Sequence, residues 1–242
     1  MVLAILQARM SSTRLPGKVM RSLVGQPMIA RQIERLRRAR GLSGIVVATS
    51  TDAGDDALEA WCGANGVACH RGPLDDVRAR FFGALAAAGS PATFIRLTAD
   101  CPLADPTLID RCIASHAETG GDYTYTSKGW TFPKGLDVEV CRTSALERAA
   151  RDSDDAYDRE HVTPYIYRHP ELFRLNAITR DPPQRYRWTV DTPEDFAFVT
   201  AVYEALYPDK PDFRMADILA WQAVHPDLVL VNSGPPPSAV IP

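Results

Sequence analysis

The chain has 242 residues, of which 45% are hydrophobic, and its formal net charge is −3 at pH 7. This size and composition suit one large α/β domain better than two small ones. No apolar run approaches the roughly 18 residues that a membrane span needs, and no basic segment precedes the first strand. We therefore expect a cytoplasmic protein without a membrane partner.

The positions of the charged residues and of the cysteines narrow the kinds of site that the protein can have. Nine Arg and Lys residues and one acid, Glu34, lie within the first 40 residues, so that segment carries +8 and the remainder −11. The asymmetry indicates a local anion site, whereas nucleic-acid binding is not expected because no helix-turn-helix or RNP pattern follows. The five cysteines are scattered without a C-x-x-C pair, which argues against a disulfide framework and a zinc site.

The anion site is expected in the loop after the first strand. The apolar run 2–6 predicts a central parallel strand that is buried on both faces. The following loop holds Arg9, Arg14 and Lys18 among small hydroxyl residues, which suits a polyphosphate and first of all a triphosphate. A solvated Arg-rich surface is the alternative. A Walker loop is excluded because Val19 stands where its magnesium-binding hydroxyl belongs, and the dinucleotide fingerprint is absent as well.

The next elements alternate between helices and short apolar strands. A helix from Pro27 places apolar side chains on one face and Arg31, Arg35 and Arg38 on another, which we expect to be solvated. Strands are expected at 45–48, 67–69 and 94–98. The helices between them are expected to bury Leu58, Trp61, Cys62, Val77, Phe81 and Leu85. This order predicts right-handed parallel β-α-β units.

Two aspartates follow apolar strands that are far apart in the sequence. Asp100 comes shortly after the strand at 94–98, and local turn hydrogen bonds are the alternative role for it. Asp191 follows the segment 187–190 and lies one residue too early to be needed for the helix cap at Thr192. The two carboxylates can meet only if their strands are neighbours in one sheet.

The chain changes character after Gly120. Segments 123–126 and 136–140 alternate like half-exposed strands, and a Phe-Pro-Lys-Gly turn lies between them. We expect these strands to form an antiparallel insertion over the triphosphate site. Capping patterns predict helix starts at Asp105-Pro106, Ser144 to Glu147 and Thr192-Pro193.

Six motifs resemble those of one family. They are Gln7-Ala8-Arg9, Ser12-Thr13-Arg14-Leu15-Pro16-Gly17-Lys18, Thr98-Ala99-Asp100-Cys101-Pro102-Leu103, Pro133-Lys134-Gly135-Leu136-Asp137-Val138-Glu139-Val140, Arg159-Glu160-His161-Val162-Thr163-Pro164-Tyr165 and Asp191-Thr192-Pro193-Glu194-Asp195. They resemble the cytidylyltransferases that make CMP-activated acidic sugars, the CMP-Kdo and CMP-sialic acid synthetases. The likeness is greatest to their SpsF-like relatives of spore coat polysaccharide synthesis, and it covers nearly the whole chain.

The resemblance implies an α/β fold. It would be a Rossmann-like nucleotidyltransferase fold of the GT-A type, with three layers, a mostly parallel sheet and a small antiparallel insertion. One domain would span 1–232, with about 120–180 as the insertion, dimerisation and acceptor region. The Pro-rich tail 233–242 is expected to be disordered.

The resemblance also implies roles for individual residues. Catalysis would rest on Arg9, Arg14, Lys18, Asp100 and Asp191. Both aspartates would hold Mg²⁺, which prefers hard oxygen ligands. The nucleotide would contact Ala8, Arg9, Ser12, Lys18, Thr49, Gly72, Asp76 and Asp100, and the acceptor Lys134, Asp137, Arg159 and His161. Helix capping by Asp52 and Asp75, and an ion pair between Arg159 and Glu160, are the alternatives in these regions.

The implied reaction is transfer of CMP from CTP to an acidic sugar, an ulosonic or nonulosonic acid, with release of pyrophosphate. It would serve the synthesis of a surface polysaccharide or glycoconjugate, and a homodimer is implied by the same resemblance. Two alternatives remain open: another nucleotidyltransferase that uses a sugar 1-phosphate, and a non-catalytic nucleotide-binding protein. Neither the acceptor sugar nor a general base can be identified from these residues.

Overall fold

Seven strands form one sheet in the computed structural model, which describes residues 2–228. The strand order is β5-β4-β1-β6-β8-β7-β9, and β8 runs antiparallel to both of its neighbours. The bounds are β1 Val2–Gln7, β4 Leu42–Ser50, β5 Ala68–Gly72, β6 Thr93–Thr98, β7 Tyr123–Tyr125, β8 Glu139–Arg142 and β9 Leu175–Ala177. A separate antiparallel hairpin consists of β2 Ser22–Leu23 and β3 Gln26–Pro27.

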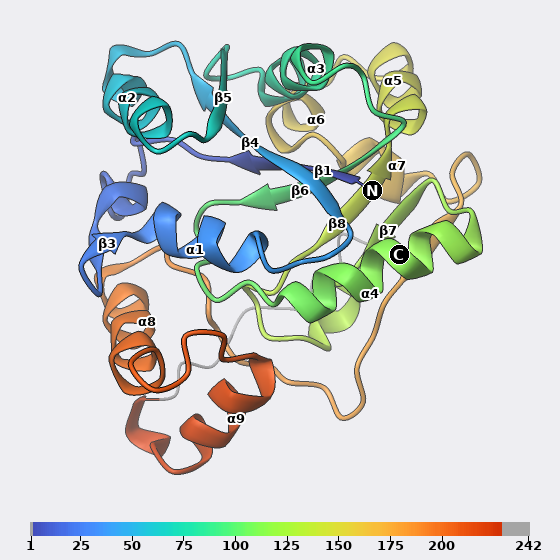
Figure 1. Cartoon of the computed structure of the whole chain (residues 1–242). Helices are drawn as coiled ribbons and strands as arrows, with labels where there is room; N and C mark the ends of the chain where they lie inside the picture. The colour runs from blue at the N-terminus through green and yellow to red at the C-terminus, as the bar shows by residue number, and fades with distance from the viewer. Residues whose placement is uncertain (1, 229–242) are drawn as a thin grey trace.

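Helices cover both faces of the sheet, as Figure 1 shows. In β1, Ile5 packs with residues of α3, α5 and α7, whereas its neighbours Ala4 and Leu6 pack with residues of α1, α4, α8 and α9. The helix bounds are α1 Met28–Leu36, α2 Asp56–Ala64, α3 Val77–Ala87, α4 Pro106–Thr119, α5 Thr143–Asp152, α6 Ala156–His161, α7 Pro164–Arg168, α8 Pro193–Leu206 and α9 Met215–Ala223. Short 3₁₀ helices lie at η1 Lys18–Met20, η2 Ala53–Asp55, η3 Lys128–Trp130 and η4 Pro226–Leu228. This arrangement confirms the predicted three-layer α/β fold with a mostly parallel sheet.

The strands expected as an insertion over the site instead extend the main sheet. β8 pairs with β6, where Val140 lies opposite Ile95, and β7 pairs with β8 on its other side. Both Val140 and Cys141 are fully buried, and they pack in the clusters on opposite faces of the sheet, so β8 is covered by helices on both faces. The predicted tail 233–242 lies outside the described residues.

The arginines of α1 are buried rather than solvated. Arg35 is 2% exposed, and its guanidinium donates to the carbonyl oxygens of Ala104 and Phe213 at 2.7 and 2.9 Å. Desolvation by this burial lowers the pKa of Arg35. Arg31 similarly donates to the Leu23 carbonyl. The helix face that carries these arginines is therefore not solvated, and Arg35 joins α1 to the chain that precedes α9.

Two of the three predicted helix caps are confirmed. Asp105 accepts hydrogen bonds at the start of α4, and Thr192 forms a capping box with Asp195 at the start of α8. The box predicted at Ser144 is wrong, because the N-cap of α5 is Arg142, two residues earlier, and it makes no side-chain cap. Within residues 2–228, no helix combines the length and apolar character that crossing a membrane would require.

Candidate active site

The basic loop leaves the sheet at the carboxyl end of its central strand. Ala8 N–H donates to the Ala48 carbonyl at 3.1 Å, and Ala99 N–H donates to the Gln7 carbonyl at 2.9 Å, so β1 ends between β4 and β6. The carboxyl ends of parallel strands are where open α/β sheets bind ligands. Gly17, with φ of +67°, then turns the chain into η1 in a conformation that favours glycine.

A buried carboxylate anchors this loop. Asp55 is 2% exposed and accepts hydrogen bonds from the Met10 N–H at 2.6 Å and from the Ser50 N–H at 3.0 Å. Burial by itself raises the pKa of Asp55, but the hydrogen bonds from Ser50 and Met10 outweigh it and hold that pKa below its ordinary value. Sequence reasoning missed Asp55, because 45 residues separate it from Met10.

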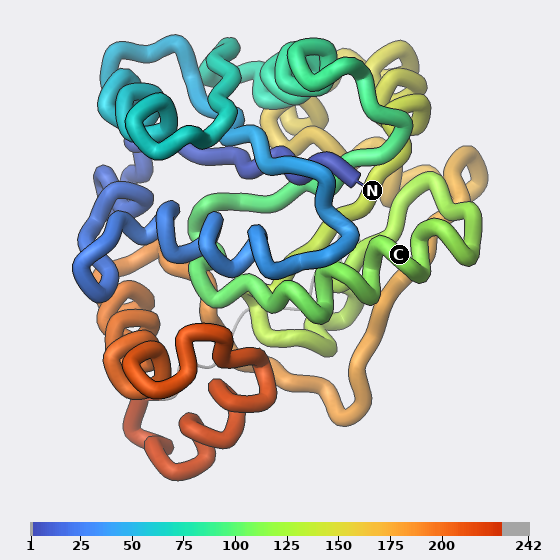
Figure 2. Tube along the Cα trace, viewed as in Figure 1, coloured from blue at the N-terminus to red at the C-terminus, as the bar shows by residue number. Residues whose placement is uncertain are grey.

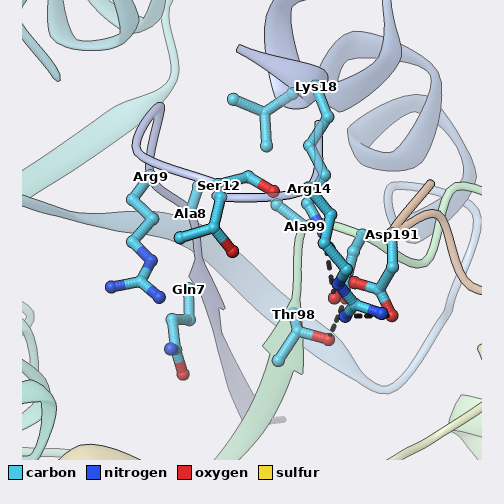
Figure 3. A pocket seen from close by; sticks show the side chains of 12 residues that line it. Gln7, Ala8, Arg9, Ser12, Arg14, Lys18, Thr98, Ala99 and Asp191 are labelled. Atoms are coloured by element: carbon cyan, nitrogen blue, oxygen red, sulfur yellow. Dashed lines mark hydrogen bonds and ion pairs between the residues drawn. The ribbon is translucent and has the colours of Figure 1, made fainter. Parts of the chain in front are cut away.

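The loop and the end of β6 enclose a cavity of about 220 Å³ (Figure 3). Seven of the predicted catalytic and nucleotide-binding residues line it: Ala8, Arg9, Ser12, Arg14, Lys18, Asp100 and Asp191. Gln7, Thr13, Val19, Thr98 and Ala99 complete the lining. The structure therefore brings together cations, hydroxyls and carboxylates that come from three distant parts of the chain.

Lys18 joins the two aspartates in the lining of this cavity. Its Nζ lies 3.1 Å from Asp191 Oδ1 and 3.4 Å from Asp100 Oδ2, and it donates to the Val190 carbonyl at 2.7 Å. The side chain is 11% exposed, so the ammonium group is largely desolvated and depends on these partners. The expected convergence of the two aspartates is therefore present.

The carboxylate of Asp191 is surrounded by positive charge. Besides Lys18, Arg14 Nη2 lies 3.2 Å and Arg187 Nη2 lies 3.0 Å from Asp191 Oδ2. Burial alone raises the pKa of Asp191, but these three cations, Lys18 first, hold it below the ordinary value. Asp191 is therefore ionised at neutral pH.

Asp191 reaches the site from an irregular segment rather than from a neighbouring strand, contrary to expectation. Val190 N–H donates to the Asp100 carbonyl at 2.8 Å, and Trp188 N–H donates to the Lys134 carbonyl at 2.7 Å. Figure 2 shows this orange segment returning from the α7 side of the molecule to the N-terminal segment before α8 begins. Direct backbone contact with Asp100 therefore replaces strand pairing.

Arg187 is a second residue that sequence reasoning missed. It donates from Nε and Nη2 to the two carboxylate oxygens of Asp195, at 2.7 and 2.8 Å, as well as to Asp191. Asp195 in turn accepts from the backbone N–H groups of Asp191 and Thr192. Arg187 and Asp195 thus fix both the backbone and the carboxylate of Asp191. No local sequence pattern indicated that Arg187, in an irregular segment, would contribute to the site.

Arg9 differs from the other two loop cations. Its side chain is exposed and makes no ion pair within residues 2–228. In Figure 3 it extends on the Gln7 side of the cavity, whereas Arg14 and Lys18 reach toward Asp191. Arg9 is therefore an unneutralised cation at the rim of the site.

Three of the predicted nucleotide contacts, Thr49, Gly72 and Asp76, do not line the cavity. Thr49 is fully buried near the end of β4. Gly72 is buried too, and a Cβ added there would meet Arg80 at 3.0 to 3.1 Å, so the glycine permits close packing of β5 on α3. Asp76 accepts from the Ala79 N–H at 2.8 Å and caps α3.

The predicted acceptor contacts are dispersed. Lys134 and Asp137 lie in the turn before β8, where Asp137 accepts from the Gly135 N–H at 2.9 Å. Arg159 pairs with Asp154 at 2.7 Å instead of with Glu160. His161 lines a second cavity, which the other three do not. The structure does not gather these four residues into one group.

The two carboxylates that line the first cavity suit a divalent ion with oxygen ligands. Asp100 and Asp191 are close enough to share one ammonium group, and carboxylate oxygens are the protein ligands that Mg²⁺ prefers. Within the described part of the chain, no group of three or more His, Cys, Asp or Glu side chains gathers as a metal site would. Two carboxylates fit Mg²⁺, which keeps several waters and takes the remaining ligands from substrate phosphates.

Known proteins are similar to this chain in sequence and in fold. The chain is 37% identical over 235 residues to the spore coat polysaccharide biosynthesis protein SpsF of Bacillus subtilis (strain 168), covering 93% of this chain and 95% of that protein. It is 34% identical over 157 residues to the 3-deoxy-manno-octulosonate cytidylyltransferase of Anaeromyxobacter dehalogenans (strain 2CP-C), covering 64% of this chain and 61% of that enzyme. A solved cytidylyltransferase from Leptospira borgpetersenii serovar Hardjo-bovis has a TM-score of 0.89 at 28% identity, covering 96% of this chain and 98% of that one.

A sequence model of the family described as Cytidylyltransferase matches residues 3–206. The match includes the basic loop and both aspartates of the cavity. This chain is therefore a nucleotidyltransferase, and it belongs to the cytidylyltransferase family.

Proposed function

We propose that this protein transfers CMP from CTP to a sugar acid, an ulosonic or nonulosonic acid, and releases pyrophosphate, with Mg²⁺ held by Asp100 and Asp191. The observation that carries this proposal is the position of Lys18 Nζ between the two carboxylates, at 3.4 and 3.1 Å, beneath a loop of cations and hydroxyls. A nucleoside triphosphate needs both kinds of partner, because its phosphates are anionic and its metal is cationic.

Two of the three cations that line the cavity are paired with its carboxylates. Arg14 and Lys18 are paired with the aspartates, and Arg9 stands unpaired at the rim. When the carboxylates hold Mg²⁺, Lys18 and Arg14 become available to the phosphate oxygens. The same cations then compensate the charge that develops on the leaving pyrophosphate.

At the α-phosphorus the reaction forms one bond and breaks one. The acceptor hydroxyl oxygen bonds to the α-phosphorus of CTP, the bond from that phosphorus to the bridging oxygen breaks, and the hydroxyl proton passes to water. Lys18 and Arg14 orient the triphosphate for in-line attack and stabilise the departing group. Bound Mg²⁺ supplies further charge compensation and lowers the pKa of a coordinated hydroxyl.

The choice of CTP and of a sugar acid is supported by the relatives. One is named a 3-deoxy-manno-octulosonate cytidylyltransferase, and another a spore coat polysaccharide biosynthesis protein. We therefore place the product in surface polysaccharide or glycoconjugate synthesis. The resemblance also supports a homodimer formed through 120–180, which sedimentation equilibrium of the full chain tests.

Pyrophosphate release tests the proposed reaction. The protein is assayed with Mg²⁺, each of CTP, UTP, GTP and ATP, and a panel of ulosonic and nonulosonic acids, with sugar 1-phosphates in parallel. We expect release only with CTP and an acid, and none from the Asp191→Asn variant. Release with a sugar 1-phosphate would select the alternative reaction. A folded protein that binds CTP but turns over nothing would be a binding protein instead.

A further inference from the structure

We propose that the acceptor sugar acid binds in a second cavity beside the first, with its carboxylate on Arg96. This cavity of about 150 Å³ is lined by residues that include Arg96, Ser127, Glu139, Tyr157, His161 and Thr163. They come from β6, from β8, from the turn between β7 and η3, and from the segment around α6 and α7. The inference rests on the proposed function and assigns the place and chemistry of its acceptor.

The two cavities share a wall. Arg96 lies two residues before Thr98 on β6, so the two side chains lie on one face of the sheet, and Thr98 lines the first cavity. Arg96 Nη2 also lies 3.3 Å from Gln7 Oε1, and Gln7 lines the first cavity as well. A ligand in the second cavity is therefore adjacent to the site where the triphosphate is placed.

Arg96 is largely buried, and not all of its hydrogen-bond donors have partners. Its side chain is 13% exposed, and Nη1 donates to Glu139 Oε1 at 2.5 Å. Nε is buried and has no partner among residues 2–228, and the bond from Nη2 to Gln7 is long. A buried guanidinium with an unpaired N–H retains capacity for a carboxylate, and pairing it removes a desolvation penalty.

The charge balance favours a sugar acid over a sugar phosphate. Glu139 neutralises Arg96, and Thr163 Oγ1 donates to the other Glu139 oxygen at 2.7 Å and holds it in place. A phosphate dianion in this cavity would bring two negative charges beside the Glu139 carboxylate, whereas a sugar acid would bring one. A sugar acid brings one negative charge for Arg96 and hydroxyl groups that can donate to Glu139. The cavity thus selects between the two acceptor classes left open by the sequence.

An aromatic surface completes the cavity. Tyr157 is 45% exposed, and its ring centroid lies 4.2 Å from that of His161. Burial lowers the pKa of His161, so its ring adds no positive charge at neutral pH. Exposed aromatic rings with polar tips suit a sugar ring, which presents apolar C–H groups and hydroxyls together.

Histidine NMR of the full chain tests this site. The ring signals of His161, assigned with His161→Gln, are followed during titration with 3-deoxy-manno-octulosonate, its uncharged methyl ester and glucose 1-phosphate. We expect the acid to shift the His161 signals, with the ester and the sugar phosphate binding about 10- to 100-fold more weakly. No shift with this or any other acid of the panel, or equal affinity for acid and ester, overturns the proposal.

Two variants locate the carboxylate. Arg96→Gln should weaken binding of the acid about 10- to 100-fold while the affinity for CTP stays unchanged. Arg96 is largely buried, so its loss can unfold the protein. Tyr157 is exposed, so Tyr157→Ala provides a second variant. It should raise the KM for the acid and leave the KM for CTP unchanged. If both variants keep the parent KM for the acid, the site is refuted although the reaction stands. If the acid binds at His161 without pyrophosphate release, the reaction fails and the site stands.

Discussion

Arg187 Nη2 lies 3.0 Å from Asp191 Oδ2, and the same guanidinium group binds both carboxylate oxygens of Asp195. The side chain of Asp195 is 3% exposed and also receives the backbone N–H of Asp191. Asp191 is therefore fixed at two points, by its own N–H and by its carboxylate. The orientation of the proposed metal ligand depends on a residue that lies outside the lining of the cavity.

Replacement of Arg187 by Gln should reduce kcat about 10- to 100-fold, as loss of an outer partner of a metal ligand does. The physical reason is that Asp191 keeps its ion pairs with Lys18 and Arg14 but loses Arg187. Arg187 links Asp191 Oδ2 to Asp195 in the first turn of α8. Steady-state assays of pyrophosphate release measure the effect. Arg148→Gln, which removes an exposed ion pair with Asp152, is the control and should leave kcat unchanged. Equal kcat values for the two variants would contradict the positioning role.

Replacement of Lys18 by Met should reduce kcat/KM for CTP about 10²- to 10³-fold, since one preorganised charge at the phosphates is lost. Lysine 18 is poised for this role because its ammonium group is largely buried beside both aspartates. Lys210→Met removes a lysine that is 53% exposed and paired with Asp217, and it should have no effect. A kcat/KM for Lys18→Met within about threefold of the parent value would exclude a contribution of the size that such groups make.

The main features of the fold and of the cavity could be predicted because they depend on local patterns. The apolar run of β1 is buried on both faces, as expected, and Thr192 caps α8. Loops that follow parallel strands gather at one edge of a sheet, so strand order alone places the basic loop near Asp100. These inferences need no knowledge of long-range contacts.

The residues that escaped prediction depend on distant segments. Arg35 lies on what reads as a polar helix face, but the chain that leads into α9 covers that face and offers a carbonyl oxygen from Phe213. Asp55 sits where acids often cap helices, yet it anchors Met10, which is 45 residues away. In each case a polar side chain is buried by a contact that no local period records.

The two aspartates should govern the affinity for divalent ions. Asp191→Asn should weaken binding of the divalent ion about tenfold or more, because the ion loses a charged ligand. Without nucleotide, Lys18→Met should act in the opposite direction and tighten binding, since its ammonium group lies between the carboxylates. Mn²⁺ titration followed by paramagnetic relaxation of water measures binding directly. Unchanged affinity in both variants would show that the ion binds elsewhere.

Replacement by alanine should be far less well tolerated at Gly135 than at Gly129, although both glycines have positive φ. At Gly135 φ is +108°, and an added Cβ would lie 2.7 Å from the backbone of Trp188 and Thr189, which leads to Asp191. At Gly129 φ is +63° and no atom lies within 4 Å of such a Cβ. Gly135→Ala should therefore lower the free energy of unfolding by about 3 kcal/mol, and Gly129→Ala by about 1 kcal/mol. Urea denaturation measures both, and equal losses would contradict the close approach at Gly135.

Replacement of Asp137 and of Asp55 by Asn should change the free energy of unfolding at pH 7 in opposite directions. Burial, followed by the charges of Glu139 and Asp100, raises the pKa of Asp137, although the Gly135 N–H opposes the shift. Above the unfolded value of 3.8 the native state therefore binds more protons at this site, and stability falls as the pH rises through the raised pKa. Asp137→Asn removes that penalty and should stabilise the protein at pH 7, with no gain at pH values below the unfolded pKa.

For Asp55 the pKa is lowered in the folded protein, because hydrogen bonds from Ser50 and Met10 outweigh the effect of burial. Its contribution to stability is present above the unfolded value of 3.8 and is lost as the pH falls through the lowered pKa. Asp55→Asn should therefore lower the free energy of unfolding at pH 7 by about 1 to 3 kcal/mol. Urea unfolding of both variants at pH 4 and pH 7 compares them directly. Destabilisation by Asp137→Asn that is equally large at both pH values would mean that Asp137 stabilises the fold through its hydrogen bond with Gly135 and that its charge carries no penalty.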